Sequence, residues 1–273
     1  MRAAVEAWLG SAGVPTGTRA EVLHDNPRRR LVRLSTASGD SLLLKQFRLG
    51  TGRHAWREAL KERIGRSPAA REWRALRRLR AAGVSVPEPL ALARLEDGDR
   101  LLVLRYVEGR PLRDALCAPR GERRRLLSLL GTRIAELHAA GFVHGDLHHG
   151  NIVVGERGPI LLDLQHARRT RRRGPRLRDL AHLDHALSYL ASRTDRLRTL
   201  SAALRLSLPV EPAGRRLLRR LAALARARAL AHAESRTRRC LRPGRAYTRI
   251  SHLTWRGLRE SDVSPGSLHE ALE

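Results

Sequence analysis

One short stretch in the middle of the chain constrains its fold more than any other feature. Residues 143–154 read VHGDLHHGNIVV, and the run LLDLQHA follows seven residues later. Asp146, Asn151 and Asp163 therefore lie in or beside loops between apolar segments. The segment from Asn151 to Asp163 predicts a short hairpin. Because a hairpin returns its two ends to one place, Asn151 and Asp163 are expected to lie close together.

Three kinds of site, besides a solvated turn, use clusters of this type. A zinc site would use His144, His148 and His149, but their spacing fits no helical pair of ligands and no cysteine accompanies them. A serine hydrolase would require the motif G-x-S-x-G, which the sequence lacks. Phosphoryl transfer would use Asn151 and Asp163 as oxygen ligands of Mg²⁺, which prefers carboxylates, waters and substrate phosphates to imidazole. The residues by themselves favour phosphoryl transfer.

From about Glu21 to Val107 the sequence is dominated by short β-like runs. Apolar residues recur in RLVRLST, SLLLKQF and LLVLRYVEG, with turn sequences between them. One helical pattern, from about Pro68 to Ala82, interrupts these runs and places Trp73, Leu76 and Leu79 at the spacing of a buried helix face. This part of the chain is expected to be a small β-rich lobe with one long helix.

The remainder of the chain is mostly helical in pattern. Its clearest helix spans residues 121–141, and a basic helical run lies in the C-terminal third. A β-rich lobe followed by a helical lobe predicts an α+β fold with a cleft between the two. We place the lobes at residues 1–107 and 108–273, as parts of one domain, with a hinge near Tyr106 to Gly109.

The spacing of the loop residues resembles that of the protein-kinase-like superfamily. There the catalytic loop reads H-x-D-x-x-x-x-N and a metal-binding D-x-x element follows, as His144, Asp146, Asn151 and Asp163 do here. The resemblance implies that Asp146 orients the acceptor hydroxyl and takes its proton. It also implies that Asn151 and Asp163 hold Mg²⁺ on the phosphates of ATP, so that ATP and Mg²⁺ are the cofactors.

The same resemblance requires a cation for the phosphates in the β-rich lobe. Lys45, in the strand-like run SLLLKQF, is one of only two lysines in the chain, and Glu72 is the only acid in the predicted helix. An ion pair between them is implied, in which both residues support catalysis and Lys45 also binds the nucleotide. The remaining nucleotide-binding residues are expected at the hinge, namely Tyr106, Val107 and Glu108.

Several positions depart from the pattern of regulated protein kinases. The turn before RLVRLST reads HDNPRRR in place of a glycine-rich loop, so backbone amides or arginines there are expected to hold the phosphates. Gly145 stands where regulated kinases carry arginine, Leu164-Gln165 replaces Phe-Gly after the metal-binding aspartate, and no A-P-E element follows. These departures favour a small-molecule or glycolipid kinase over a Ser/Thr protein kinase.

The flanking segments look like those of the lipopolysaccharide kinase family, the bacterial kinases of Kdo and heptose in the inner core. That family has an E-W pair in the helix of the β-rich lobe, D-L-Q in place of D-F-G, and an S-R-T-D-R motif in the helical lobe. Here these are Glu72-Trp73, Asp163-Leu164-Gln165 and Ser192 to Arg196, within a resemblance that runs from about Leu42 to Leu200. It implies ATP-dependent phosphoryl transfer to a sugar hydroxyl of a lipopolysaccharide core or a similar anionic glycolipid. Asp179 is expected to anchor the catalytic loop by hydrogen bonds.

Alternatives to a glycolipid kinase stay open at this point. An aminoglycoside- or choline-type phosphotransferase shares the loop HGDLHxGN, but such enzymes often line the acceptor pocket with acids, whereas the block from Arg168 to Arg178 is basic. A protein kinase is another alternative, and a kinase-like scaffold is the non-enzymatic one. The intact set of expected site residues argues against a scaffold.

The net charge of +27 has two interpretations. Of the 54 basic residues only Lys45 and Lys61 are lysines, and such uniform use of arginine is typical of codon bias in a GC-rich genome. The other interpretation is selection for a polyanionic partner, with the block 168–178 as the platform for an anionic acceptor. Aromatic residues, which stack on single-stranded nucleic acid, make up only 3% of the chain, so no specific nucleic-acid partner is expected.

Signals for export or membrane insertion are not apparent. No uninterrupted apolar stretch of about 18 residues is present, as a membrane-spanning helix would require. Glu6 interrupts the N-terminal apolar residues that a secretory signal would need, and Cys117 and Cys240 lack the spacing of a metal site or disulfide framework. A cytoplasmic protein is therefore expected, with peripheral contact to the inner membrane surface if its acceptor is a lipid-linked sugar.

Overall fold

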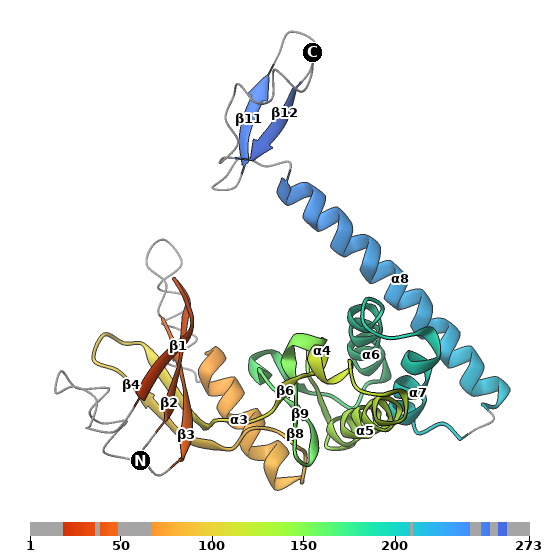
Figure 1. The fold of residues 1–273 in the computed structure, drawn as a ribbon, viewed down its shortest axis with the longest axis horizontal. Helices are drawn as coiled ribbons and strands as arrows, with labels where there is room; N and C mark the ends of the chain where they lie inside the picture. The colour runs from red at the N-terminus through yellow and green to blue at the C-terminus, as the bar shows by residue number, and fades with distance from the viewer. Residues whose placement is uncertain are drawn as a thin grey trace.

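The computed structural model describes residues 19–35, 39–48, 67–207, 210–240, 247–251 and 256–260. Figure 1 shows a β-sheet lobe and a helical lobe side by side, with one long helix projecting from the helical lobe. The α+β architecture expected from the sequence is thereby confirmed. Within the described ranges, no helix has both the length and the apolar character needed to cross a membrane. Glu6 and Lys61 lie outside these ranges.

The first lobe is built on a five-stranded antiparallel sheet with the order β1-β2-β3-β5-β4. The apolar runs read from the sequence form three of these strands. Strand β1 was not singled out, because it is exposed along nearly its whole length and lacks the alternation of a half-buried strand. The strands are β1 (Arg19–Asn26), β2 (Arg29–Ser35), β3 (Ser41–Phe47), β4 (Pro89–Arg94) and β5 (Arg100–Arg105).

Side chains of β3 alternate between the two faces of this sheet. Leu42 and Leu44 are buried in an apolar cluster on one face, together with Val32 and Leu34 of β2. Because neighbouring side chains in a strand lie on opposite faces, the buried Lys45 points to the other face. The strand thus directs its one ammonium group toward the helix that covers that face.

Helix α3 (Pro68–Ala81) is the single long helix of this lobe, and it packs against β4 and β5. It begins at Ser67, whose hydroxyl accepts a hydrogen bond from a backbone N–H of the first turn. Glu72, Leu76 and Leu79 are buried on one side of the helix, at the spacing of a single helical face. The apolar residues of that face therefore fix the direction in which Glu72 points.

The second lobe is mostly helical, as the sequence patterns indicate. The hairpin expected between Asn151 and Asp163 is formed by β8 and β9, which pair antiparallel. Apolar side chains from α3 and β5 join those of the helical lobe in one continuous core, so the two lobes are packed together. The elements are β6 (Arg110–Pro111), α4 (Leu112–Ala115), α5 (Arg120–Ala139), β7 (Phe142–Val143), η1 (His149–Asn151), β8 (Ile152–Gly155), β9 (Gly158–Leu161), η2 (Leu164–His166), β10 (Arg168–Arg169), α6 (Arg173–Leu187) and α7 (Arg193–Leu204).

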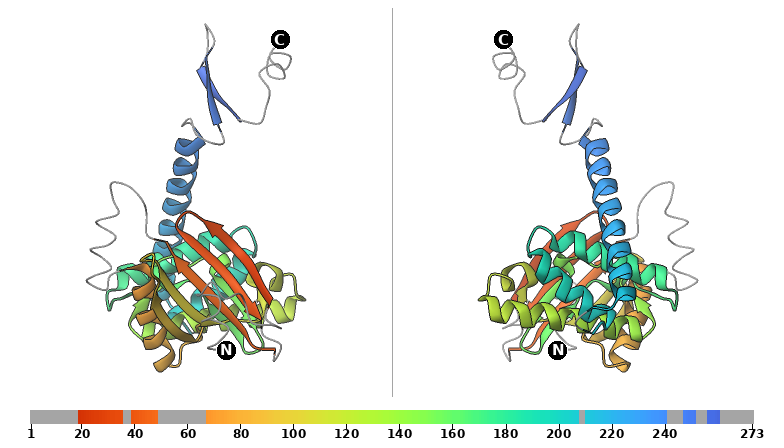
Figure 2. Two further views of the ribbon diagram at one scale, coloured as in Figure 1. Left: turned by 90° about the vertical axis from the view of Figure 1, so that its left-hand side faces the viewer. Right: turned by 90° about the vertical axis from the view of Figure 1, so that its right-hand side faces the viewer.

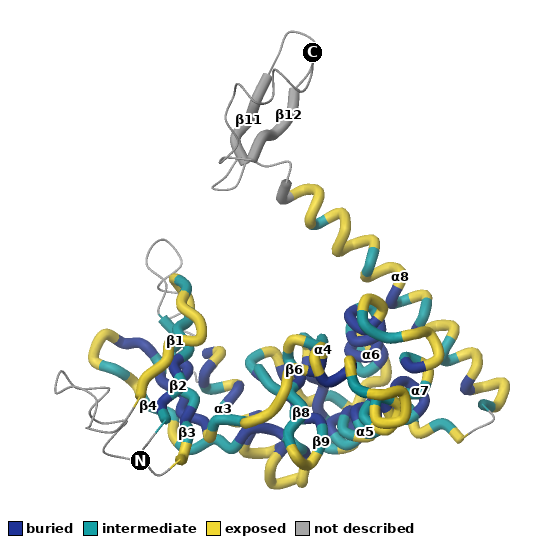
Figure 3. The backbone as a smooth tube through the Cα atoms, viewed as in Figure 1, coloured by how far each residue is buried: buried dark blue, intermediate teal, exposed yellow. Residues whose placement is uncertain are grey.

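Helix α8 (Pro212–Cys240) is the basic helix expected in the C-terminal third. Its first half packs against α6 and buries Leu221 and Ala225. Its second half extends away from both lobes in Figure 2 and is mostly exposed in Figure 3. A hairpin of β11 (Tyr247–Ser251) and β12 (Arg256–Glu260) follows, which the sequence patterns did not reveal.

Candidate active site

The loop after β7 is held in place by one buried carboxylate of α6. Asp179 accepts hydrogen bonds from the backbone N–H groups of His144 (2.6 Å) and Gly145 (2.9 Å), and His138 lies 3.4 Å from it. Burial by itself would raise the pKa of Asp179, but the hydrogen bonds from His138 and the two backbone groups outweigh burial and lower it. The expected anchoring of the loop by Asp179 is confirmed.

Gly145 occupies a position where no side chain fits. Its φ is +83°, and a Cβ built on it would lie 2.5 Å from the carbonyl oxygen of His166. The loop packs this closely against η2, so only glycine satisfies both the backbone conformation and the close approach. The missing arginine of regulated kinases is therefore a consequence of the local packing.

Asn151 and Asp163 are brought to the same side by the β8–β9 hairpin. The Asn151 side-chain amide donates a hydrogen bond to the backbone carbonyl of Asp146 (2.9 Å), which leaves its carbonyl oxygen as the group able to face a cation. Leu162, next to Asp163, donates its backbone N–H to the carbonyl of Asn151 (2.9 Å). Asp163 itself adopts the left-handed conformation, with φ 55° and ψ 61°, at the turn between β9 and η2.

The two lobes meet in a chain of charges around Asp163. Lys45 Nζ lies 2.7 Å from Glu72 Oε1 and 3.1 Å from Asp163 Oδ1. Burial raises the pKa of Glu72, although Lys45 opposes the shift, and Glu72 Oε2 has no hydrogen-bond partner among the described residues. The structure thus forms the Lys45–Glu72 ion pair and extends it to Asp163 of the other lobe.

Arg29 is a member of this cluster that was not among the predicted site residues. It stands at the start of β2, directly after a turn in which Asn26 Oδ1 accepts its backbone N–H (2.8 Å). Its guanidinium donates to both carboxylate oxygens of Asp163, at 3.1 and 3.2 Å. Burial would raise the pKa of Asp163, but Lys45 and Arg29 together lower it. The signal in the sequence was the arginine-rich turn HDNPRRR that replaces a glycine-rich loop.

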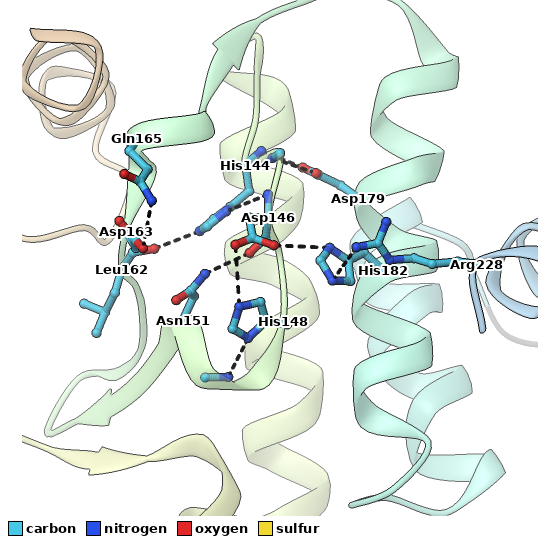
Figure 4. A network of polar contacts seen from close by, with 12 residues as sticks. His144, Asp146, His148, Asn151, Leu162, Asp163, Gln165, Asp179, His182 and Arg228 are labelled. Atoms are coloured by element: carbon cyan, nitrogen blue, oxygen red, sulfur yellow. Dashed lines mark hydrogen bonds and ion pairs between the residues drawn. The ribbon is translucent and has the colours of Figure 1, made fainter. Parts of the chain in front are cut away.

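Asp146 lies at the centre of the network in Figure 4, between Asn151 and His182. Its carboxylate is 3.7 Å from His148 Nε2 and 3.8 Å from His182 Nδ1. The nearby imidazole of His148 is the main cause that lowers the pKa of Asp146 to about 2, against the effect of partial burial. The carboxylate is therefore ionised at neutral pH and half-exposed, as a group that accepts a proton from a substrate must be.

His182 of α6 and Arg228 of α8 extend this network, and neither was predicted from the sequence. Arg228 Nη2 lies 2.8 Å from His182 Nε2. Because a guanidinium can only donate, Nε2 accepts, and the proton of the neutral imidazole is on Nδ1, which faces Asp146. Burial and the charge of Arg228 lower the pKa of His182 to about 4, so the ring is neutral at pH 7.

The expected hinge residues lie in the connection between β5 and β6. Tyr106 donates its backbone N–H to the carbonyl of Ser41 (2.9 Å), and the guanidinium of Arg33 stacks 4.2 Å above its ring. Arg33 also pairs with Glu108. Contact of Tyr106, Val107 and Glu108 with a nucleotide stays a prediction, as does the lobe boundary at residue 107.

The donor atoms near Asp146 and Asp163 suit Mg²⁺ better than zinc. One amide oxygen and one carboxylate, from Asn151 and Asp163, are the protein ligands that Mg²⁺ commonly combines with waters and phosphate oxygens. In the described part of the chain, no three His, Cys, Asp or Glu residues are grouped as a metal site. His144 instead contacts the carbonyl of Leu162 at 2.9 Å, and His148 faces Asp146.

Comparison with protein families and solved structures agrees with this geometry. The model of a family described as "Lipopolysaccharide kinase (Kdo/WaaP) family" matches residues 16–202. The crystal structure of an aminoglycoside-3'-phosphotransferase of type VIII is similar, with a TM-score of 0.53 and 18% sequence identity, and the match covers 82% of this chain and 98% of that chain. At this identity the similarity establishes the fold, which is the kinase-like phosphotransferase fold.

Two curated proteins are similar over shorter segments. The KEOPS complex subunit Bud32 of Pyrococcus abyssi is 35% identical over 94 residues, which are 34% of this chain and 41% of that protein. A probable bifunctional tRNA threonylcarbamoyladenosine biosynthesis protein of Methanothermobacter thermautotrophicus is 31% identical over 102 residues, which are 37% of this chain and 18% of that protein. The chain therefore spans less than half the length of these relatives.

Proposed function

The chain belongs to the lipopolysaccharide kinase (Kdo/WaaP) family and is an ATP-dependent phosphotransferase, and from this premise we propose that its acceptor is a sugar hydroxyl of a lipopolysaccharide core, on Kdo or heptose, or of a similar anionic glycolipid. The observation that carries the kinase chemistry is the convergence of Lys45, Glu72 and Asp163 from two lobes, beside Asp146 and Asn151. We assign residues 1–107 to a nucleotide-clamping lobe and residues 108–273 to an acceptor-binding lobe.

In this proposal each charged side chain has one task. Asp146 orients the acceptor hydroxyl and takes its proton, because its carboxylate is ionised at neutral pH and half-exposed beside the loop. Lys45, fixed by Glu72, neutralises charge on the ATP phosphates, and the hinge residues 106–108 hold the adenosine end. Asn151 and Asp163 would hold Mg²⁺, which when bound neutralises negative charge on the phosphates and aligns the terminal one for transfer.

Arg29 takes the place of the glycine-rich loop in this proposal. A guanidinium matches a phosphate as well as a carboxylate, with two parallel hydrogen bonds in either case. We infer that the guanidinium of Arg29, which pairs with Asp163, can instead donate its hydrogen bonds to a phosphate of ATP. This exchange would leave the Asp163 carboxylate able to bind the metal.

Anionic acceptors are favoured over cationic ones by the charges near the loop. An aminoglycoside would require carboxylates around Asp146, yet on its α6 side Asp146 faces the neutral ring of His182, and the guanidinium of Arg228 lies behind that ring. A lipid-linked sugar would bring the protein to a membrane surface, for which we propose peripheral contact at the cytoplasmic face of the inner membrane. The positive net charge suits such a surface.

A direct assay tests the acceptor. The purified protein is incubated with γ-labelled ATP and Mg²⁺ in the presence of extracted lipopolysaccharide core, free sugars, aminoglycosides or unrelated proteins. We expect label in the lipopolysaccharide core and none with the Asp163→Asn variant, which controls for contaminating kinases. Label in aminoglycosides or proteins alone would contradict the proposed acceptor while leaving the phosphotransferase activity in place.

The Lys45–Glu72 pair is expected to act as one unit. Lys45→Ala and Glu72→Ala should each lower kcat/KM by about a hundredfold. Lys45→Ala should also destabilise the fold by about 3 kcal/mol, because it leaves the buried Glu72 without its partner, and Glu72→Ala should destabilise it less, because Asp163 still pairs with Lys45. The double variant should lose little more than either single variant, in a double-mutant cycle of kcat/KM and of the free energy of unfolding. Additive losses would show that the residues are not functional partners. The exposed pair Arg105–Glu88 provides a control with little effect on catalysis.

Arg29→Ala is expected to raise the KM for ATP by about tenfold or more, since it removes a charge-assisted contact to phosphate. The matched control is Arg28→Ala, at an exposed position in the same turn. Steady-state kinetics and nucleotide titration of both variants provide the measurement. An unchanged ATP affinity in Arg29→Ala would contradict its assignment to the phosphates.

A further inference from the structure

A small cavity of about 160 Å³ opens beside the catalytic loop, on the side facing α6 and α8. Its walls include Gly145, the residue before Asp146, and His182, whose ring lies 3.8 Å from the Asp146 carboxylate. The cavity therefore adjoins the residue assigned to the acceptor hydroxyl, and it lies apart from the Lys45–Asp163 cluster assigned to the nucleotide.

Three arginines from three separate elements line this cavity. Arg168 comes from β10, Arg178 from α6 and Arg228 from α8. Within the described ranges none of them forms an ion pair with a carboxylate, and Arg228 instead donates to the neutral ring of His182. Three guanidinium groups around so small a space repel one another, and an anion in the cavity would relieve that repulsion.

The one carboxylate in the wall offsets only part of this repulsion, one negative charge against three positive ones. Asp179 lines the cavity, but its two oxygens already accept the backbone N–H groups of His144 and Gly145. It is also buried, whereas the three arginines are exposed and free to turn their donors toward a ligand. A planar, forked donor is the group that binds phosphate and carboxylate with two hydrogen bonds.

We propose that this cavity binds a phosphate or carboxylate group of the acceptor and thereby holds the sugar hydroxyl at Asp146. The inference rests on the proposed function, since it names how an anionic acceptor is recognised. It also revises the expected platform. Arg168 and Arg178, at the ends of the basic block, line the cavity, whereas Arg173 lines a different cavity between α5, α6 and α7. His182 connects the cavity to Asp146. Its Nε2 contacts Arg228, which lines the cavity, and its Nδ1 faces the Asp146 carboxylate.

The first test measures anion binding without catalysis. The Arg168→Gln/Arg178→Gln double variant is compared with wild type and with Arg215→Gln/Arg216→Gln, which removes the same charge from exposed positions of α8. Inorganic phosphate is added against chloride at constant ionic strength, with Mg²⁺ and a non-hydrolysable ATP analogue present to fill the nucleotide site. Phosphate should raise the Tm of wild type and of the α8 variant, and not that of the cavity variant. A phosphate effect that is absent from wild type, or that is equal in all three proteins, overturns the proposal.

The second test connects the cavity to the acceptor. The KM for extracted lipopolysaccharide core should rise about tenfold or more in the cavity variant, while the KM for ATP stays within about twofold. Loss of phosphate binding with an unchanged KM for the core would show that the cavity holds a free anion, which overturns the assignment to the acceptor. If the wild type phosphorylates no glycolipid, the proposed function fails, and the first test still decides whether the cavity binds an anion.

Discussion

Replacing Asp163 with asparagine is expected to lower kcat by about a hundred- to a thousandfold or more. Asp163 is the carboxylate on which Lys45 and Arg29 converge, and with Asn151 it is proposed to hold Mg²⁺. An amide in its place keeps the size of the side chain and removes the charge. The metal is then held weakly, and the phosphates lose a fixed partner.

The fold should survive this substitution. Asparagine tolerates the left-handed conformation of residue 163 nearly as well as aspartate does, so no backbone strain is added. Circular dichroism and thermal unfolding would check the fold, and single-turnover kinetics over a range of Mg²⁺ concentrations would check the role. The matched control is Asp114→Asn, in the first turn of α4, which should leave activity unchanged. Turnover at the wild-type level in the Asp163 variant would refute the assignment.

Asp146→Asn is expected to lower kcat by about a hundred- to ten-thousandfold, the range that a positioned general base contributes. The KM for ATP should change little, because Asp146 is not among the groups assigned to the nucleotide. A large rise in that KM with kcat unchanged would place Asp146 at the nucleotide instead of the acceptor. Steady-state kinetics with both substrates varied would separate the two outcomes.

The pH dependence provides an independent check on Asp146. Its pKa is lowered to about 2, so the carboxylate stays ionised as the pH falls from 8 to about 4, and kcat/KM should show no acidic limb from this group in that range. Because the folded-state pKa lies below the ordinary value, the stability that the carboxylate contributes is present above pH 3.8 and is lost as the pH falls through about 2. His148→Gln removes the main cause of the shift and should move any acidic limb to higher pH. An acidic limb between pH 5 and 6 in the wild type, assigned to Asp146, would contradict this account.

Most of the fold and the position of the catalytic loop could be predicted from the local spacing of residues in the sequence. The hairpin between Asn151 and Asp163 and the helix over α5 follow from patterns within about twenty residues, and the structure forms both. The pairing of Lys45 with Glu72 was implied by the resemblance to the protein-kinase-like superfamily, and the structure forms it. The β11–β12 hairpin could not be predicted, because it follows no clear apolar alternation.

The partners of the site residues were harder to foresee than the residues themselves. Arg29 reaches Asp163 across 134 positions of sequence, and Arg228 reaches His182 across 46. Only two of the 54 basic residues are lysines. The residue type therefore does not distinguish a functional arginine from the many others. Composition therefore left open whether the positive charge has a function.

The sequence by itself determined the chemistry available to this protein, because residue types at fixed local spacing set which donors, acids and oxygen ligands can meet in one loop. It specified a two-lobed kinase with Asp146, Asn151 and Asp163 at its centre. Only the tertiary structure decided which of the many arginines converge, because a long side chain can act several ångströms from its backbone and the packing of α6, α8 and β10 sets where the donors meet. The tertiary structure also decided that residue 145 must be glycine, because the loop there packs closely against η2. This packing excludes the arginine by which regulated kinases sense phosphorylation.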